Sequence, residues 1–162
     1  MDLQLECIVI EKSDDTSVIL GHAGFIKTVE DLYEAMVGSV PGVKFGIAFA
    51  EASGPCLVRS DGNDDALRAQ AESSILKIGA GHTFLILFTG AYPINIITNV
   101  RNVSEVAGIY CATSNPVQVI VAKVEEGRSV VGIVDGSPSR AIEGLDDKQK
   151  RSKLLRELGY KK

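Results

Sequence analysis

The stretch Lys44-Phe-Gly-Ile-Ala-Phe-Ala-Glu51 decides the fold, because its apolar side chains alternate between large and small. Successive side chains of a strand point to opposite faces, so Phe45, Ile47 and Phe49 share one face. The residues between them are Gly46, Ala48 and Ala50. The pattern therefore predicts a buried strand with another element packed closely against its small face.

Further apolar runs predict more strands. Leu3, Leu5, Cys7 and Val9 alternate with mostly polar residues, which is typical of a half-buried strand. The other runs are enriched in β-branched or aromatic residues and cover residues 18–20, 83–88, 107–111, 117–124 and 130–134.

Two helices are predicted between these strands. Apolar residues at 29, 32, 33, 36 and 37 share one helical face, and Thr28 is the expected N-cap. A second helix is expected over 64–78, capped by Asn63 or Asp64 and ended by Gly79.

Two more helices follow later in the chain. Pro93 suits the first turn of a short helix, which would carry Asn95, Asn99 and Asn102 as a polar stripe. A C-terminal helix is predicted over 146–158, with acids first, bases later and a glycine after it. We therefore expect an α+β fold, or an irregular α/β fold: one domain over residues 1–162, with a mixed sheet and three to four helices.

Composition excludes several classes of protein. The 162 residues carry a net charge of −4 with 45% hydrophobic residues, which argues against disorder and against general nucleic-acid binding. No apolar run is long enough for a membrane span or a signal peptide, so we expect a cytoplasmic protein. Residues 143–162 hold seven basic and four acidic residues, a net charge of +3. The preceding residues therefore carry a net charge of −7.

The cysteines Cys7, Cys56 and Cys111 are odd in number and far apart. This spacing argues against a disulfide framework and against structural zinc. We expect buried, reduced thiols.

Polar loops follow several strands. Glu51 to Pro55 offers a carboxylate, a hydroxyl and a glycine, and residues 60–64 open a helix whose free N–H groups suit an anion or a Mg²⁺-bound phosphate. Residues 113–116 and 135–140 carry further polar groups of the same kind. Each loop is equally compatible with an ordinary surface turn or helix cap.

The two histidines differ in setting. His22 is expected in a turn between a strand and a helix, whereas His82 follows Gly79-Ala-Gly81 and precedes an apolar strand. Such a position at the edge of a cleft suits a general base or a phosphoryl acceptor, and a structural role is the alternative. No P-loop or complete GxGxxG motif accompanies it.

Several strings together resemble the adenosine-specific kinase family, a small and largely archaeal group. They are Gly24-Phe-Ile-Lys-Thr-Val-Glu-Asp31, Phe49-Ala-Glu-Ala-Ser-Gly-Pro55, Ile78-Gly-Ala-Gly-His82, Tyr92-Pro-Ile-Asn95, Cys111-Ala-Thr-Ser-Asn-Pro116 and Gly132-Ile-Val-Asp-Gly136. The resemblance implies binding of adenosine or AMP, phosphoryl transfer through a phosphohistidine, and a homo-oligomer such as a trimer or a multiple of one. A histidine commonly precedes the Phe-Ile-Lys-Thr string in the family; here that place is Gly24, which puts more weight on His82.

On this basis His82 is the expected phosphoryl acceptor, with ATP or another donor and possible help from Mg²⁺. The amides near Ser53 and Gly54, or near Gly136 and Ser137, would cradle the phosphoryl group. Lys44 or Arg59 would supply positive charge. Asn95, Asn99 and Asn115 suit adenine or ribose, and Glu51 or Asp135 suits Mg²⁺ or ribose.

Two other functions compete with this interpretation. A non-catalytic AMP-binding or sensor protein is favoured by the lack of a recognisable ATP cradle, and turnover separates it from a kinase. A metal-dependent hydrolase fits poorly, because two histidines so placed make neither a facial triad nor an HExxH site.

Overall fold

The computed structural model describes residues 2–162, which form eight strands and four helices. The predicted α+β class is confirmed. The strands are β1 (Gln4–Val9), β2 (Ser17–Ala23), β3 (Lys44–Ala50), β4 (Val58–Gly62), β5 (Thr83–Thr89), β6 (Val106–Thr113), β7 (Val117–Val124) and β8 (Gly127–Asp135). The helices are α1 (Thr28–Val37), α2 (Asp65–Ile78), α3 (Pro93–Arg101) and α4 (Leu145–Glu157).

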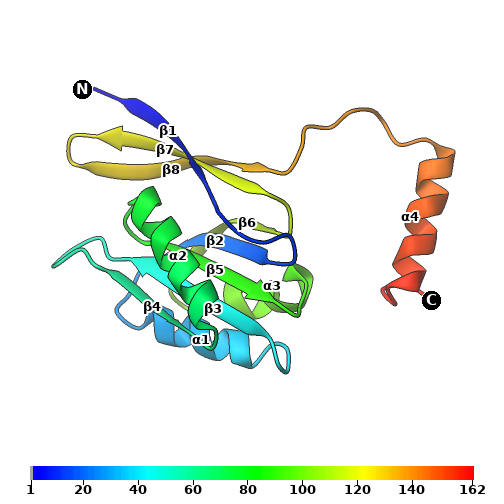
Figure 1. Ribbon diagram of the computed structural model, residues 1–162, viewed down its shortest axis with the longest axis horizontal. Helices are drawn as coiled ribbons and strands as arrows, with labels where there is room; N and C mark the ends of the chain where they lie inside the picture. The colour runs from blue at the N-terminus through cyan, green and yellow to red at the C-terminus, as the bar shows by residue number, and fades with distance from the viewer. Residues whose placement is uncertain (1) are drawn as a thin grey trace.

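The strands make two sheets (Figure 1). A five-stranded sheet has the order β4-β3-β5-β2-β6, and a three-stranded sheet has the order β1-β7-β8. All pairs among the described strands are antiparallel, where the sequence predicts one mixed sheet. Side-chain periodicity shows which residues share a face, but it does not encode the direction of the neighbouring strand.

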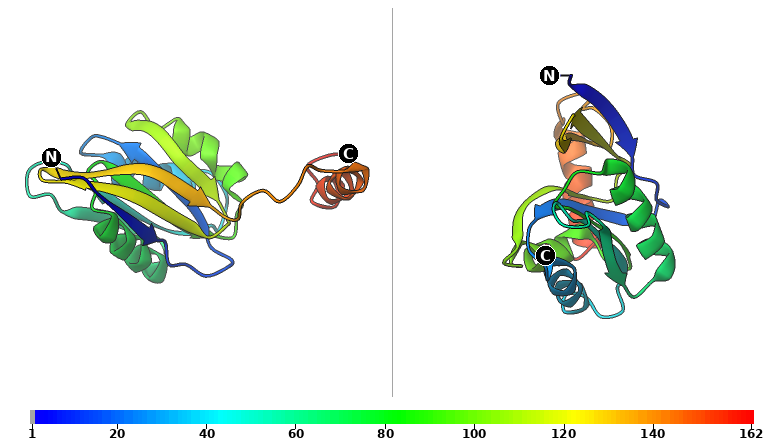
Figure 2. Two further views of the ribbon diagram at one scale, coloured as in Figure 1. Left: turned by 90° about the horizontal axis from the view of Figure 1, so that it is seen from above. Right: turned by 90° about the vertical axis from the view of Figure 1, so that its left-hand side faces the viewer.

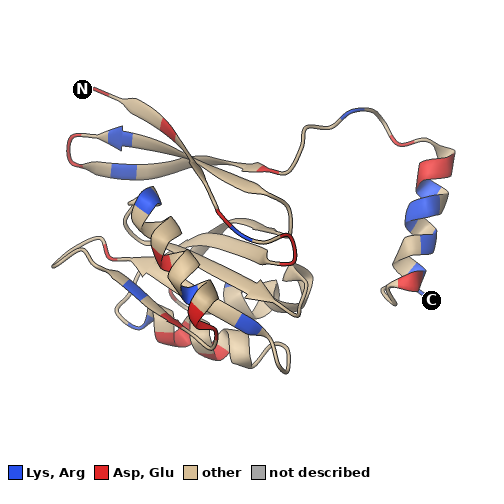
Figure 3. Cartoon of the chain, in the orientation of Figure 1, with Lys and Arg blue, Asp and Glu red and all other residues tan. Residues whose placement is uncertain are grey.

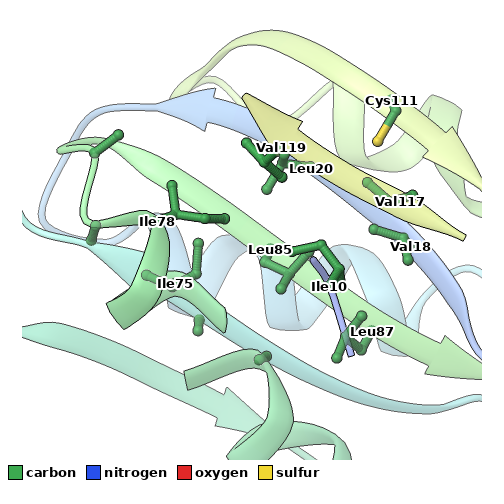
Figure 4. Packing of buried hydrophobic residues seen from close by; sticks show 14 of the residues in the cluster. Ile10, Val18, Leu20, Ile75, Ile78, Leu85, Leu87, Cys111, Val117 and Val119 are labelled. Carbon is green, nitrogen blue, oxygen red and sulfur yellow. The ribbon is translucent and has the colours of Figure 1, made fainter. Parts of the chain in front are cut away.

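Three layers result, as Figure 2 shows from two further sides. Helices α1 and α3 pack on one face of the five-stranded sheet, where Phe45, Ile47 and Phe49 join Leu32 and Met36 in the core. Helix α2 and the three-stranded sheet cover the opposite face. Figure 4 shows this second core, in which Leu85 of β5 and Leu20 of β2 lie among side chains from α2 and β7.

The close approach to the small face of β3 is confirmed. A β-carbon built on Gly46 would lie 2.1 Å from the backbone nitrogen of Arg68 in α2. Only glycine fits here, because the helix backbone occupies the space of a side chain. Asp64 caps α2 by accepting a hydrogen bond from the Leu67 N–H, and Gly79 ends the helix in a left-handed conformation, both as expected.

Other local predictions are wrong. Thr28 is not the N-cap of α1, which is Lys27; its hydroxyl donates instead to the carbonyl of Phe25. His22 lies within β2 and not in a turn. Of the cysteines only Cys111 is buried, and burial raises the pKa of its thiol to about 11.

Candidate functional site

A cavity of about 360 Å³ opens at one end of the five-stranded sheet. There β3 leads into the 51–57 loop and the 79–82 segment leads into β5. Its volume is in the range of small-molecule sites. It is lined by Gly24, Phe25, Ile26, Phe49, Glu51, Ala52, Ser53, Arg59 and His82.

The backbone of His82 holds an unusual conformation at this site. Its φ of 62° lies in the left-handed region, which side-chain-bearing residues rarely adopt. The His82 N–H donates to the carbonyl of Ala50 at 2.8 Å, and its own carbonyl accepts from the Ala23 N–H at 2.9 Å. Because β3 and β2 both bond to this residue, its strained backbone is fixed, and so is the point from which the ring extends.

The imidazole of His82 is enclosed by rings and glycines. It stacks on Phe49 with ring centroids 6.0 Å apart and meets His22 edge-on at 5.7 Å. A β-carbon on Gly24 would lie 3.2 Å from Nδ1 of His82, so a side chain there would crowd the ring. Gly81 is equally restricted, because its β-carbon would lie 2.7 Å from that of Ala52.

Glu51 and Arg59 face each other across the mouth of the 51–57 loop. One Glu51 oxygen accepts from the Leu57 N–H at 2.9 Å, and the other accepts from Nε of Arg59 at 2.6 Å. The Leu57 amide and then the Arg59 guanidinium hold the pKa of the Glu51 carboxyl below its usual value. Glu51 is thus a fixed anion that orients Arg59. Its lowered pKa makes the Glu51 carboxylate a poor proton acceptor.

Arg59 also joins two walls of the cavity. Its Nη1 donates to the carbonyl of Ile26 at 2.5 Å, so the guanidinium bridges the 51–57 loop and the segment before α1. Within residues 2–162, Nη2 has no hydrogen-bond partner. Three of the five N–H donors of this permanent cation, two of them on Nη2, therefore remain for an anionic ligand.

Lys27, beside the cavity, is neutralised by its own neighbours. Its ammonium contacts the carboxylates of Asp31 and Glu105, and the Glu105 side chain is only 4% exposed. The hydrogen bond with Asp31 raises the pKa of Lys27, and the same contact lowers the pKa of Asp31. Moving Lys27 away would leave Glu105 buried and unpaired, so Arg59 is the cation available to a ligand.

The structure brings together only part of the predicted site. His82, Glu51, Ser53 and Arg59 line one cavity, and Gly54 follows Ser53 on the same loop. Lys44 lies at the opposite end of β3 from the cavity. An extended strand of this length places it about 20 Å from Ala50, the last residue of the strand.

The remaining predicted residues lie away from the cavity in other local contacts. Asn95 accepts from the Tyr92 N–H at the start of α3, and Asn99 donates to Ser39. The Asp135 carboxylate accepts from Thr113 and Asn115, and so ties the β6–β7 turn to the end of β8. Gly136 and Ser137 follow directly on that strand.

The cavity also contains residues that sequence reasoning did not assign to it. Phe49 lines the cavity although its sequence pattern is that of a core residue of β3, and His22, predicted in a turn, contacts the His82 ring without lining the cavity. Gly24, Phe25 and Ile26 belong to a quoted family string, which was the available signal for them. No group of three or more His, Cys, Asp or Glu side chains suited to a metal occurs among residues 2–162. Nor is any helix of that part of the chain long and apolar enough to cross a membrane.

Comparisons with known proteins identify a family and a solved structure with the same fold. The model of the family described as "Adenosine specific kinase" matches residues 8–161. The solved structure of the PH1918 protein from Pyrococcus horikoshii OT3 is 48% identical in sequence and covers 99% of both chains with a TM-score of 0.96. The search of curated proteins found no match.

Proposed function

Because the chain belongs to the adenosine-specific kinase family, we propose that it binds adenosine and AMP in the His82 cavity and transfers a phosphoryl group to adenosine. The observation that carries the proposal is the position of His82: its backbone is held by two hydrogen bonds, and its imidazole lines a ligand-sized cavity together with an arginine that has free donors. Neutral imidazole is a good nucleophile, and phosphoryl transfer needs mainly positioning and positive charge.

The proposed reaction has two steps. A ring nitrogen of His82 attacks the terminal phosphorus of ATP or another phosphoryl donor, forming an N–P bond while the P–O bond to the leaving group breaks. The 5′-hydroxyl of adenosine then attacks that phosphorus, the N–P bond breaks, and the electron pair returns to the imidazole. The hydroxyl proton leaves to water, because the hydrogen bonds that lower the pKa of Glu51 make its carboxylate a weak base.

Each remaining wall of the cavity has a role in the proposal. Nη2 of Arg59 binds the phosphate oxygens, and the backbone amides near Ser53 and Gly54 add further donors. Phe25 lines the cavity and is 59% exposed as a residue, which suits stacking of its ring on a flat base such as adenine. Mg²⁺ enters only as a companion of the donor's phosphates, because Glu51 is already engaged by Leu57 and Arg59.

A non-catalytic AMP sensor is the second candidate, and one observation favours it. Arg59 is the only Lys or Arg among the described residues that line the cavity. One cation suits the monophosphate of AMP better than the triphosphate chain of ATP.

Turnover separates the two candidates. We expect purified protein, mixed with adenosine, ATP and Mg²⁺, to form AMP, as measured by chromatography. His82→Asn should abolish this activity while AMP binding, measured by calorimetry, is retained. Wild-type protein that binds AMP but forms none with any of several phosphoryl donors would favour the sensor.

A further inference from the structure

Helix α4 is an amphipathic element without a partner in its own chain. All of α4 lies within the described residues, and none of its side chains is buried. Leu154 and Leu158 are 51% and 48% exposed, and they share a face because they are four residues apart. Figure 1 shows the helix standing apart from the sheets at the end of an extended linker.

Such a helix needs an external contact to be stable. A helix of 13 residues is marginal in water, and most helical stability in proteins comes from packing. The arm formed by residues 136–162 nevertheless has a defined position in the solved Pyrococcus horikoshii structure. That structure matches with a TM-score of 0.96 over 99% of both chains, which a displaced arm of this length would not permit. An arm that keeps one position without contacts to its own body is held by another molecule.

A second apolar surface is also uncovered, on the outer face of the three-stranded sheet. Leu5 and Val9 of β1 are 66% and 55% exposed, and Val131 of β8 is 60% exposed. Cys7 lies between the first two on the same face and is exposed as well. The alternation in β1 is that of a strand with a buried face, yet its own chain leaves that face open.

Charge distinguishes the two surfaces. The segment 143–162 carries +3 and the preceding residues carry −7. Figure 3, which colours the ribbon by residue type, shows basic positions along α4 and acidic ones near its ends. Acidic residues outnumber basic ones on and beside the three-stranded sheet, where Asp2, Glu6, Glu125, Glu126 and Asp135 accompany Lys123 and Arg128. A basic helix and an apolar surface whose surrounding charges are mainly acidic are complementary.

We propose that α4 packs on a second copy of this chain, with its Leu154–Leu158 face against the outer face of that copy's three-stranded sheet. One contact then covers both uncovered surfaces. The linker carries α4 away from its own sheet. An exchange of α4 between two copies therefore buries the apolar faces that a single chain leaves exposed. This inference does not depend on the proposed phosphoryl transfer, and its test uses no activity.

The first test measures mass. Light scattering of wild-type protein should give a multiple of 17.3 kDa. The double variant Leu154→Glu/Leu158→Glu should lower that mass to the monomer, with an unchanged body judged by circular dichroism. Gln149→Glu/Ser152→Glu adds the same charge to another side of α4 and should keep the oligomer. A monomeric wild type, or equal masses for wild type and Leu variant, would overturn the proposal.

The second test locates the contact with the native cysteines. Cys56 is exposed and Cys111 is buried, so one serves as a reactive standard and the other as an unreactive one. In the oligomer Cys7 should be protected from a maleimide, and in the Leu154→Glu/Leu158→Glu variant it should react as fast as Cys56. If Cys7 reacts equally fast in both proteins, α4 does not cover this sheet and the proposal is wrong.

Discussion

Gly24 leaves the space that the His82 ring requires: a β-carbon at position 24 would lie 3.2 Å from Nδ1 of that ring. The backbone of Gly24 is outside the left-handed region, so a larger residue is excluded by contact and not by backbone strain. The ring on its other side meets Phe49 and His22. A side chain at position 24 must therefore displace the imidazole.

We predict that Gly24→Val weakens AMP binding about tenfold, or about 1.4 kcal/mol, and lowers any phosphorylation of His82. Calorimetry with AMP measures the first effect. Gly108→Val is the matched control, since a β-carbon on this nearby strand glycine meets nothing within 4 Å. Equal affinities for Gly24→Val and wild type would contradict the proposed location of the ligand.

Arg59→Lys should separate phosphate binding from nucleoside binding. Lysine cannot reproduce the planar guanidinium that bonds Glu51 and Ile26 while presenting Nη2 to a ligand. AMP affinity should fall about tenfold, while adenosine affinity should change by less than about twofold. Competition binding with both ligands measures this, with Arg101→Lys on α3 as the control. Equal losses for both ligands would mean that Arg59 does not contact the phosphate.

The Glu51 contacts predict a pH dependence of stability. The amide of Leu57 and the guanidinium of Arg59 lower the pKa of Glu51 in the folded protein below its ordinary 4.5. Their stabilising effect is present above the ordinary value and is lost as the pH falls through the lowered one. Glu51→Gln should therefore lower the melting temperature at neutral pH, and its difference from wild type should shrink in acid. The same difference at every pH would argue against an anionic Glu51, and Glu125→Gln in the exposed β7–β8 turn is the control.

Gly46→Ala tests the packing of α2 on β3. The added β-carbon would lie 2.1 Å from the backbone of Arg68, so the helix must move away from the sheet. We predict a loss of about 1–3 kcal/mol or more in the free energy of unfolding, measured with urea. Gly132→Ala, where the β-carbon meets nothing within 4 Å, should change stability far less. An unaffected Gly46→Ala protein would contradict the close approach of the two backbones.

Much of the fold follows from local patterns in the sequence. The alternation in residues 44–51 predicts both faces of β3, and Asp64 and Gly79 mark the ends of α2. These features are predictable because they depend on neighbours in the chain. The alternation in β1 predicts that Leu5, Cys7 and Val9 form the buried face, but the structure leaves that face exposed, because a strand's own pattern does not show what covers it.

The site was less predictable, for a physical reason. The site residues come from three separate segments that meet at one end of the sheet: Glu51 and Ser53 follow β3, Arg59 is the second residue of β4, and His82 precedes β5. Asn95, Asn115 and Asp135 have equally suitable side chains, but their strands and helix place them elsewhere. Residue type shows what a side chain can bind, whereas only the topology shows which side chains meet.

The most direct test of the central claim is the intact mass of the protein during turnover. Protein incubated with ATP and adenosine should be measured at neutral or basic pH, where a phosphohistidine survives. We predict a species heavier by one phosphoryl group that is lost in acid and is absent in His82→Asn. Unmodified protein throughout active turnover, or a label that survives acid, would contradict the role of His82 as the phosphoryl carrier.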